Sequence, residues 1–218
     1  WYLRVIAYCH ARLRRKTELP VKTHPFTACI IVVGNITVGG AGKTPTVIAM
    51  AQQLQAEGYK VGVISRGYGR SSENLHEVHQ DSLVSDAGDE PILIRNQLQC
   101  PVVVAQNRYH ALQHLVQNHS IDVVLSDDGL QHTALPRNLE ICLIDGRRGL
   151  GNGLLLPAGP LREPPEVMAR IDRVLYKELQ PQGLPLGDVM RVCLDSAYSL
   201  ETQQERDLAN WEGKVVHA

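Results

Sequence analysis

Residues 29–44 read Cys-Ile-Ile-Val-Val-Gly-Asn-Ile-Thr-Val-Gly-Gly-Ala-Gly-Lys-Thr. The stretch opens as a β-branched apolar run, typical of a buried strand, and breaks into glycines before Gly-Lys-Thr, where a helix is expected to begin. Glycines let the backbone curl so that successive N–H groups point at phosphate oxygens, and the positive end of the helix favours the same anion. The stretch therefore predicts a phosphate loop. The residues expected to bind nucleotide are Thr37, Val38, Gly39, Gly40, Ala41, Gly42, Lys43 and Thr44.

Two side chains of this loop are expected to act on the phosphates directly. Lys43 would reach the terminal phosphates, and the hydroxyl of Thr44 would hold Mg²⁺. The sequence departs from the usual pattern at one position, because Thr37 stands where that pattern has a glycine five residues before Gly42. The strand, loop and helix context that the motif requires is present, so the prediction of a nucleotide site stands.

Short apolar runs alternate with helical patterns beyond this loop. The further expected strands are 61–65, 102–105, 123–126, 141–145 and 174–176, and the clearest expected helices are 46–57, 91–97 and 107–118. Apolar strands that alternate with helices imply a parallel sheet covered on both faces. The predicted fold class is α/β, a P-loop NTPase-like, mostly parallel sheet covered by helices on both faces, with the start of a second, smaller α/β domain at the C-terminus.

Three segments are expected along the chain. Residues 1–24 are predicted to form a basic amphipathic or membrane-proximal helix, 25–180 the P-loop domain, and 181–218 a linker with the beginning of a truncated second domain. The first segment holds six Arg or Lys residues against Glu18 alone, a net charge of +5, so the remainder sums to −6. Its apolar opening is too short to span a bilayer, which needs about 20 apolar residues. It could lie in the membrane interface or pack on the domain as an ordinary amphipathic helix, and both readings stay open.

Composition excludes several classes of protein. The 218 residues are 44% hydrophobic and 21% charged, which is enough apolar content for a sizeable core. The five cysteines are odd in number and widely spaced, so neither a disulfide framework nor a Cys-x-x-Cys metal site is indicated, and reduced thiols in a cytoplasmic compartment are expected. Basic residues cluster at the start without an aromatic stacking motif, which argues against nucleic-acid binding. No obligate protein partner is evident.

Glycines, carboxylates and arginines gather after the expected strands. Residues 65–70 read Ser-Arg-Gly-Tyr-Gly-Arg, 127–132 read Asp-Asp-Gly-Leu-Gln-His, and 145–148 read Asp-Gly-Arg-Arg. The ligand edge of a parallel sheet is where its strands end, so these loops are expected to meet there. Residues 149–165 form a long Gly/Pro loop with an apolar centre, and a loop of that length tends to be functional. The candidate substrate-binding residues are Arg66, Tyr68, Arg70, Arg108, Gln131, His132 and Arg148.

Four carboxylates are candidates for metal binding or proton transfer. Asp127 and Asp128 end a hydrophobic run, as expected for the strand-end acid that binds Mg²⁺ beside a phosphate loop, although a solvated turn would look the same. Asp89 and Glu90 begin an expected helix. Asp89 would serve as a helix cap, or as the carboxylate that accepts a proton from an acceptor hydroxyl, and the residues alone leave both open.

Five motifs in order along the chain then become recognisable as a set. They are Gly-Asn-Ile-Thr-Val-Gly-Gly-Ala-Gly-Lys-Thr-Pro, Ser-Arg-Gly-Tyr-Gly-Arg, Gly-Asp-Glu-Pro, Ser-Asp-Asp-Gly-Leu-Gln-His and Leu-Leu-Pro-Ala-Gly-Pro-Leu-Arg-Glu-Pro. Together, from about residue 30 to residue 174, they closely resemble the tetraacyldisaccharide 4'-kinases, or lipid A 4'-kinases, of Gram-negative bacteria. Five ordered motifs are far more specific than a phosphate loop alone.

The resemblance implies an ATP- and Mg²⁺-dependent kinase of lipid A (lipopolysaccharide) biosynthesis. Its acceptor would be the 4'-hydroxyl of tetraacyldisaccharide 1-phosphate, its product lipid IVA, and its location the cytoplasmic face of the inner membrane, peripheral or anchored through the N-terminal helix. By position, Lys43 and Asp89 resemble the family's catalytic residues. Thr44, Asp127, Asp128 and Glu90 correspond to its metal-site residues.

One part of the family pattern has no counterpart in the sequence. The catalytic aspartate of the family is paired with a histidine from the second domain, and within residues 1–218 no histidine stands in that motif, His217 included. The second domain is therefore expected to be truncated soon after Ala218.

Two other functions compete with the lipid kinase. One is a P-loop kinase or ATPase that acts on a soluble metabolite, which the apolar Gly/Pro loop and the basic start disfavour. The other is a nucleotide-dependent switch. Switches of the Gly-Gly-x-Gly-Lys-Thr type usually carry a lysine where this chain has Val38, and no Asn-Lys-x-Asp motif follows the strands.

Overall fold

The computed structural model describes residues 26–191, 196–198 and 205–207. The helix predicted for residues 1–24 lies outside these residues, as does most of the second unit predicted for 181–218. Within that second stretch, β9 (Ser196–Tyr198) and β10 (Glu205–Asp207) pair as an antiparallel ribbon.

The main body is built on an eight-stranded sheet with the order β3-β4-β2-β5-β1-β6-β7-β8. Neighbouring strands run parallel throughout, except that β3 pairs with β4 in the antiparallel sense. This confirms the predicted mostly parallel α/β sheet. The strands are β1 (Cys29–Gly34), β2 (Val61–Ser65), β3 (His76–Glu77), β4 (Val102–Val104), β5 (Val123–Asp127), β6 (Leu139–Asp145), β7 (Arg173–Lys177) and β8 (Asp188–Met190).

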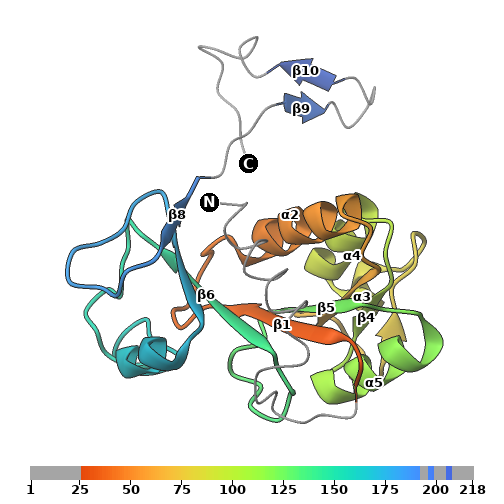
Figure 1. The fold of residues 1–218 in the computed structure, drawn as a ribbon, viewed down its shortest axis with the longest axis horizontal. Helices are drawn as coiled ribbons and strands as arrows, with labels where there is room; N and C mark the ends of the chain where they lie inside the picture. The colour runs from red at the N-terminus through yellow and green to blue at the C-terminus, as the bar shows by residue number, and fades with distance from the viewer. Residues whose placement is uncertain (1–25, 192–195, 199–204, 208–218) are drawn as a thin grey trace.

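Helices cover both faces of this sheet (Figure 1). They are α2 (Lys43–Ala56), α3 (Val84–Ala87), α4 (Asp89–Gln97), α5 (Arg108–Asn118) and the 3-10 helix η1 (Pro165–Arg170). The side chains of alternate β1 residues pack in two separate hydrophobic cores, one on each face of the sheet. Ile31 packs in the core that α2 and α4 cover, whereas Ile30 packs in the core that α5 and η1 cover. An all-apolar β1 is therefore required by burial on both faces.

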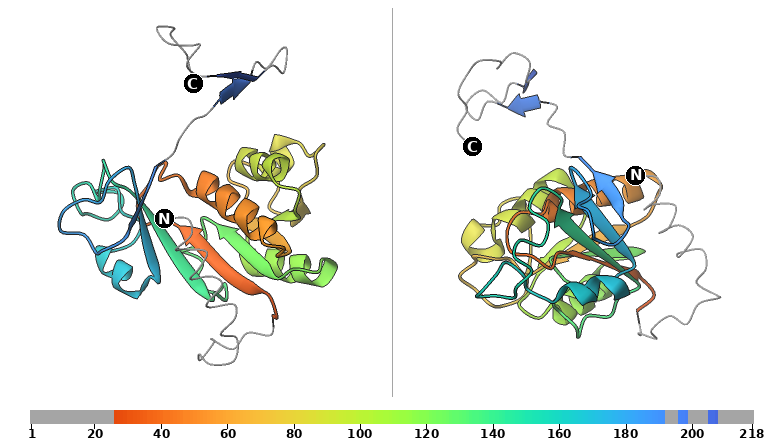
Figure 2. Two further views of the ribbon diagram at one scale, coloured as in Figure 1. Left: turned by 45° about the horizontal axis from the view of Figure 1, so that its top comes forward. Right: turned by 90° about the vertical axis from the view of Figure 1, so that its left-hand side faces the viewer.

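Register places the ends of the central strands together. Val33 near the end of β1 pairs with Asp127 at the end of β5, and Gly34 pairs with Cys142 of β6. The loops that follow these strands consequently meet at one edge of the sheet, above the start of α2, which the views of Figure 2 show from two sides. That edge carries the candidate site.

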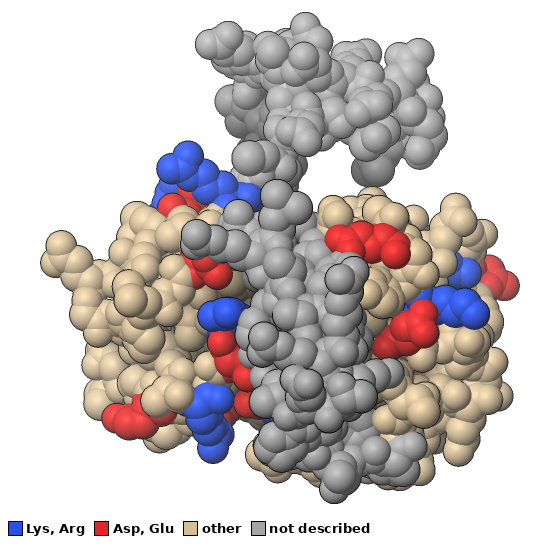
Figure 3. Space-filling model, in the orientation of Figure 1, with Lys and Arg blue, Asp and Glu red and all other residues tan. Residues whose placement is uncertain are grey.

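The last strand of the sheet, β8, comes from the chain beyond residue 180. The strand β8 pairs with β7, and the Met190 sulfur lies 3.5 Å from the Thr46 hydroxyl on α2. Part of the segment predicted as a linker therefore belongs to the main sheet. On the face drawn in Figure 3, basic and acidic side chains are interspersed.

Candidate active site

The phosphate loop, residues 35–42, turns sharply from β1 into α2. Gly39 and Gly42 adopt φ values of +100° and +85°, which side chains other than glycine rarely tolerate. A Cβ atom on Gly39 would also lie 2.5 Å from the Arg148 guanidinium. Two backbone hydrogen bonds fasten the loop to the Gly/Pro loop, residues 149–165: Val38 N–H donates to the Pro160 carbonyl at 2.8 Å, and Arg162 N–H donates to the Ile36 carbonyl at 2.7 Å.

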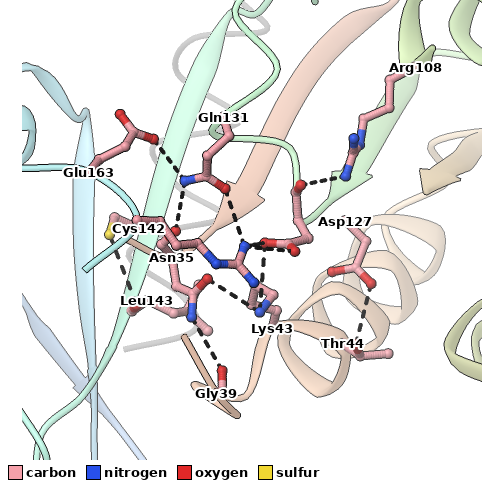
Figure 4. Close-up of polar contacts among 12 residues, drawn as sticks. Asn35, Gly39, Lys43, Thr44, Arg108, Asp127, Gln131, Cys142, Leu143 and Glu163 are labelled. Carbon is pink, nitrogen blue, oxygen red and sulfur yellow. Dashed lines mark hydrogen bonds and ion pairs between the residues drawn. The ribbon is translucent and has the colours of Figure 1, made fainter. Parts of the chain in front are cut away.

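Lys43, the first residue of α2, is held over this loop by two oxygen atoms (Figure 4). Its Nζ donates to Asn35 Oδ1 at 3.3 Å and lies 3.7 Å from Asp128 Oδ1. Asn35 is fully buried, and its amide nitrogen donates to the Gly39 carbonyl at 3.4 Å. The asparagine thus ties the lysine and the loop backbone into one unit.

Asp127 faces the start of the same helix from the end of β5. Its Oδ2 accepts a hydrogen bond from the Thr44 hydroxyl at 3.3 Å, while its Oδ1 is buried without a hydrogen-bond partner. Burial raises the pKa of Asp127 to about 7, and the negative charges of Glu90 and Asp128 add to that rise. Lys43 and the Thr44 hydroxyl oppose it. A buried carboxylate with one free oxygen beside a threonine hydroxyl has the donor chemistry that Mg²⁺ prefers.

Asp128 lies at the centre of an arginine cluster and adopts φ +50°. One Arg162 nitrogen donates to both Asp128 carboxylate oxygens at 2.9 Å, and Arg108 donates to the Asp128 carbonyl at 2.6 Å. Arg108 is buried, and burial lowers its pKa while the charge of Asp128 opposes this. Gln131 joins the cluster to the phosphate loop, because its amide nitrogen donates to the Asn35 carbonyl at 3.0 Å and to Glu163 at 2.7 Å.

A cavity of about 950 Å³ opens beside Lys43 on the β2 side of β1. It brings together most of the predicted site, from loops that are distant in the sequence. The predicted residues that line it are Gly39, Gly40, Ala41, Gly42, Lys43, Thr44, Arg66, Tyr68, Glu90, Arg108, Asp128, Gln131 and His132. Burial lowers the pKa of His132, and the charges of Arg108 and Arg137 lower it further. The cations that line the cavity next to the phosphate loop are Lys43, Arg66, Arg108 and Arg162.

Other predicted residues lie away from this cavity. Thr37, Val38 and Arg148 line a smaller cavity of about 60 Å³ on the β6 side of the phosphate loop. Arg70 donates to the carbonyls of Asn74 and Glu73, at 2.6 and 3.0 Å, so its guanidinium closes its own loop.

Asp89, for which two roles are expected, stands at the start of α4. The residue that caps α4 is Gly88, whose φ of +88° and close approach to the Tyr68 carbonyl leave no room for a side chain. Asp89 is the first helical residue, and its exposed carboxylate accepts only a local hydrogen bond from the Glu90 N–H at 2.9 Å. Gly88 takes the N-cap position, but the Asp89 carboxylate still accepts from one of the N–H groups that the first turn of α4 leaves without a backbone partner, so the cap reading and the proton-acceptor reading both stay open.

Three residues of the site had no role assigned from the sequence. They are Asn35, Arg162 and Glu163, all of which stand inside the recognised motifs. The signal available was their place in those motifs. Their partners, Lys43, Asp128 and Gln131, are 8, 34 and 32 residues away along the chain, and spacing alone does not reveal such contacts.

Two absences among the described residues bear on the site. No helix among them has the length and apolarity to cross a membrane. Nor do three or more His, Cys, Asp or Glu side chains in this part of the chain form a metal cluster. A cation at Thr44 and Asp127 would therefore need further oxygen ligands from phosphates or water.

Comparison with known proteins gives a consistent result. A family model described as tetraacyldisaccharide-1-P 4'-kinase (LpxK) matches residues 1–217. The tetraacyldisaccharide 4'-kinase of Hahella chejuensis is 54% identical over 192 residues, which are 87% of this chain and 56% of that protein. The protein of the same name from Methylobacillus flagellatus is 42% identical over 218 residues, 99% of this chain and 62% of the relative.

A solved structure supports the same likeness. A crystal structure described as the "apo" form of LpxK from Aquifex aeolicus in complex with ATP superposes with a TM-score of 0.71 at 29% identity, over 99% of this chain and 69% of that chain. The chain spans about half the length of the curated relatives it matches, 56% and 48% for the kinases of Hahella chejuensis and Legionella pneumophila (strain Corby).

Proposed function

The chain belongs to the tetraacyldisaccharide-1-P 4'-kinase family, and from that premise we propose that the protein transfers the γ-phosphoryl group of ATP to a lipid. The acceptor is the 4'-hydroxyl of tetraacyldisaccharide 1-phosphate, and the product is lipid IVA. In the reaction the acceptor oxygen forms a bond to the γ-phosphorus, the bond from that phosphorus to the β–γ bridging oxygen breaks, and ADP leaves.

The observation that carries this proposal is the arrangement around Lys43. The lysine stands between the phosphate loop and Asp128, at the wall of a cavity that Arg66, Arg108 and Arg162 also line. Phosphoryl transfer depends mostly on positioning and on charge stabilisation. A cationic cavity beside a phosphate loop supplies both, and its volume of about 950 Å³ is large enough for a bulky acceptor.

Mg²⁺ is the metal that these residues fit best. The Thr44 hydroxyl and the buried Asp127 would hold it, and the unpartnered Asp127 Oδ1 is the atom available for direct or water-mediated contact. Asp128 and Glu90 stand close enough to add negative charge at this point, since both raise the pKa of Asp127. When bound, the ion neutralises charge on the phosphate oxygens.

Asp89 is proposed to accept the proton of the acceptor hydroxyl. Its carboxylate is exposed, its side chain accepts a hydrogen bond from the adjacent Glu90 N–H alone, and its neighbour Glu90 lines the cavity. The proton acceptor must be a carboxylate that is not engaged by an arginine, and Asp128 is engaged by Arg162. Arg66, Arg108, Gln131 and His132 are proposed to contact the acceptor or the nucleotide.

The site of action is proposed to be the cytoplasmic face of the inner membrane, where a lipid acceptor would be presented. The basic, apolar start of the chain supports this location through its composition, a net charge of +5 over residues 1–24. Neither nucleic acid nor an obligate protein partner is part of the proposal.

Transfer of labelled γ-phosphate from ATP to tetraacyldisaccharide 1-phosphate in detergent tests the function, using the full-length protein. Asp89→Ala is expected to abolish transfer while ATP still binds, and Lys43→Ala to lose transfer together with phosphate affinity. Asp86→Ala is the matched control, because this nearby acid contacts only the Ser85 hydroxyl through its side chain. A folded, ATP-binding wild type that does not phosphorylate the lipid would place the soluble-substrate kinase or the switch ahead of this proposal.

A further inference from the structure

The side chain of Arg137 is held by four oxygen atoms just before β6 begins. Its Nε donates to the Leu135 carbonyl at 3.1 Å, and its Nη2 donates to the His132 carbonyl. Its Nη1 donates both to the Leu130 carbonyl at 3.2 Å and to Glu140 Oε1 at 2.7 Å. Only 9% of this side chain is exposed. All three guanidinium nitrogens are therefore bonded, and the cation is a fixed part of the structure.

The three carbonyls belong to one turn, residues 129–135, which follows the carboxylates at the end of β5. Leu130 and Leu135 are buried, 5% and 1% exposed, and anchor this turn in the hydrophobic core. Gln131 and His132 stand between them and line the cavity of about 950 Å³ beside the phosphate loop. The guanidinium thus bonds to a turn whose side chains reach the candidate active site.

Two side chains of the turn are placed for a ligand. The Gln131 amide accepts from Arg162 at 3.3 Å and donates to the Asn35 carbonyl of the phosphate loop at 3.0 Å (Figure 4). His132 Nε2 is buried and has no hydrogen-bond partner among the residues that the structure describes. A buried polar atom of this kind costs free energy unless a ligand or a water molecule bonds to it. The position of the turn therefore decides where these two groups meet a ligand.

The segment that carries Arg137 is itself fastened to the sheet. The next residue, Asn138, exchanges two hydrogen bonds of 2.7 Å with the Ile30 backbone of β1. Glu140, the carboxylate that accepts from Arg137, pairs with Val32 of β1 through the backbone of β6. An arginine suits this place, because its planar fork of five N–H donors reaches oxygens in several directions, whereas a lysine ammonium is a single point of charge. Arg137 therefore joins the turn to the central strands.

We propose that Arg137 is a positioning residue for phosphoryl transfer, which fixes the 129–135 turn so that Gln131 and His132 keep their places in the cavity. The inference rests on the proposed function and deepens it, because Arg137 does not itself line the cavity. Groups that act on a reacting centre must be held to a fraction of an ångström by the residues around them. Without the guanidinium, three carbonyls of the turn lose a donor, and the turn shifts to satisfy them.

The test is transfer of labelled phosphate from ATP to tetraacyldisaccharide 1-phosphate by the full-length protein in detergent micelles. Arg137→Met keeps the apolar stem and removes the fork, so kcat/KM for the lipid should fall at least about tenfold through lost alignment. The Kd for ATP should stay unchanged. Arg137→Lys keeps the charge and should still lose part of this efficiency. Arg95→Met is the matched control and should keep full efficiency, because this arginine donates to a single carbonyl, that of Leu98 at 3.3 Å, away from the cavity.

A double-mutant cycle separates positioning from a general loss of stability. In a protein that already carries Gln131→Ala and His132→Ala, assayed in single turnovers with excess enzyme, Arg137→Met should cost little further efficiency, because groups that act as one unit are not additive. If thermal unfolding shows that Arg137→Met does not fold, Arg137→Lys takes its place in the cycle.

Several results would overturn the positioning role. They are an undiminished further loss in the Gln131→Ala, His132→Ala background, equal losses in Arg95→Met and Arg137→Met, and a weakening of ATP binding as large as the loss of lipid efficiency. A wild type that transfers phosphate, with variants at Arg137 that match it, would overturn this inference alone. A folded wild type that binds ATP and phosphorylates no lipid would overturn the proposed function, and the inference with it.

Discussion

The phosphate loop with its facing carboxylates and the Gly/Pro loop depart from ordinary burial in opposite directions. Around the phosphate loop, polar atoms are buried without partners, namely one oxygen of Asp127, the Ser126 hydroxyl and Arg108 Nε. In the Gly/Pro loop, three consecutive leucines, 154–156, are exposed. Buried polar atoms and exposed apolar patches are the two informative exceptions to burial. The two loops lie side by side, because the Val38 N–H donates to the Pro160 carbonyl and the Arg162 N–H donates to the Ile36 carbonyl.

The largest expected effect comes from removing the buried charge at Asp127. Burial holds its pKa at about 7, above the ordinary value of 3.8, so the folded protein binds this proton more tightly than the unfolded chain does. Ionised Asp127 therefore lowers stability, increasingly from about pH 4 and fully above pH 7. Asp127→Asn should raise the free energy of unfolding of the nucleotide- and metal-free protein by roughly 4 kcal/mol at pH 8, and by about 2 kcal/mol at pH 5.

Urea denaturation at the two pH values measures this difference. Asp81→Asn, which changes an exposed carboxylate, serves as the control and should show no comparable dependence. A gain in Asp127→Asn that is the same at pH 5 and pH 8 would contradict the account. Ionisation of the buried Asp127 carboxylate would then not lower the free energy of unfolding.

The next effect concerns Lys43 and is kinetic. Lys43→Ala removes the cation beside the phosphate loop, and under the proposed function turnover should fall by roughly 10²–10³-fold, as for the loss of one charge-stabilising donor. The thermal unfolding midpoint should change little, because the lysine makes only long contacts, of 3.3 and 3.7 Å, to Asn35 and Asp128. Lys60→Ala, at an exposed lysine that contacts Ser120, should leave turnover intact. If both variants lost turnover alike, the loop would not be the phosphate site.

Some elements of the fold can be predicted from the sequence, and others cannot. The strand β2 and the turn into α2 follow from apolar runs and glycines, which are local signals. The strand β3 has only two residues, His76 and Glu77, and β8 has three, so neither carries a periodic pattern. These strands depend on pairing with a neighbour, and pairing is a tertiary effect.

The candidate site shows the same division. The residue types at Lys43 and Asp127 identify their chemistry before the fold is known. The contact of Arg162 with Asp128 and the close approach of Gly88 to the Tyr68 carbonyl depend on how distant loops meet. Motif reading therefore finds the charged residues of the site, whereas the exposure of leucines 154–156 is known only from the structure.

Glycines of the two loops should respond differently to an added methyl group. A Cβ on Gly159 would lie 2.2 Å from Asn152 Oδ1 and 2.3 Å from the Leu154 carbonyl, so Gly159→Ala should cost about 1–3 kcal/mol of stability through overpacking. A Cβ on Gly40 meets nothing within 4 Å, so Gly40→Ala should keep its stability. Under the proposed function it should lose ATP affinity, because the added methyl group narrows the cavity that Gly40 lines. Thermal unfolding and ATP titration of both variants separate the two loops; a stable Gly159→Ala would show that the Gly/Pro loop is not tightly packed.

The smallest expected effect is that of Leu155→Ala, which tests whether the exposed leucines serve the fold. Leu155 and Leu161 bridge to one another within the same loop, yet Leu155 is 46% exposed and Leu161 is fully buried. Leu161→Ala should cost about 2–5 kcal/mol, the usual loss for a buried leucine, whereas Leu155→Ala should stay within about 0.5 kcal/mol. Urea denaturation compares them directly. If Leu155→Ala cost as much as Leu161→Ala, the exposed leucines would serve the fold. A near-zero cost means that folding does not require an apolar residue there, and the reason for a leucine must be sought in what the loop touches.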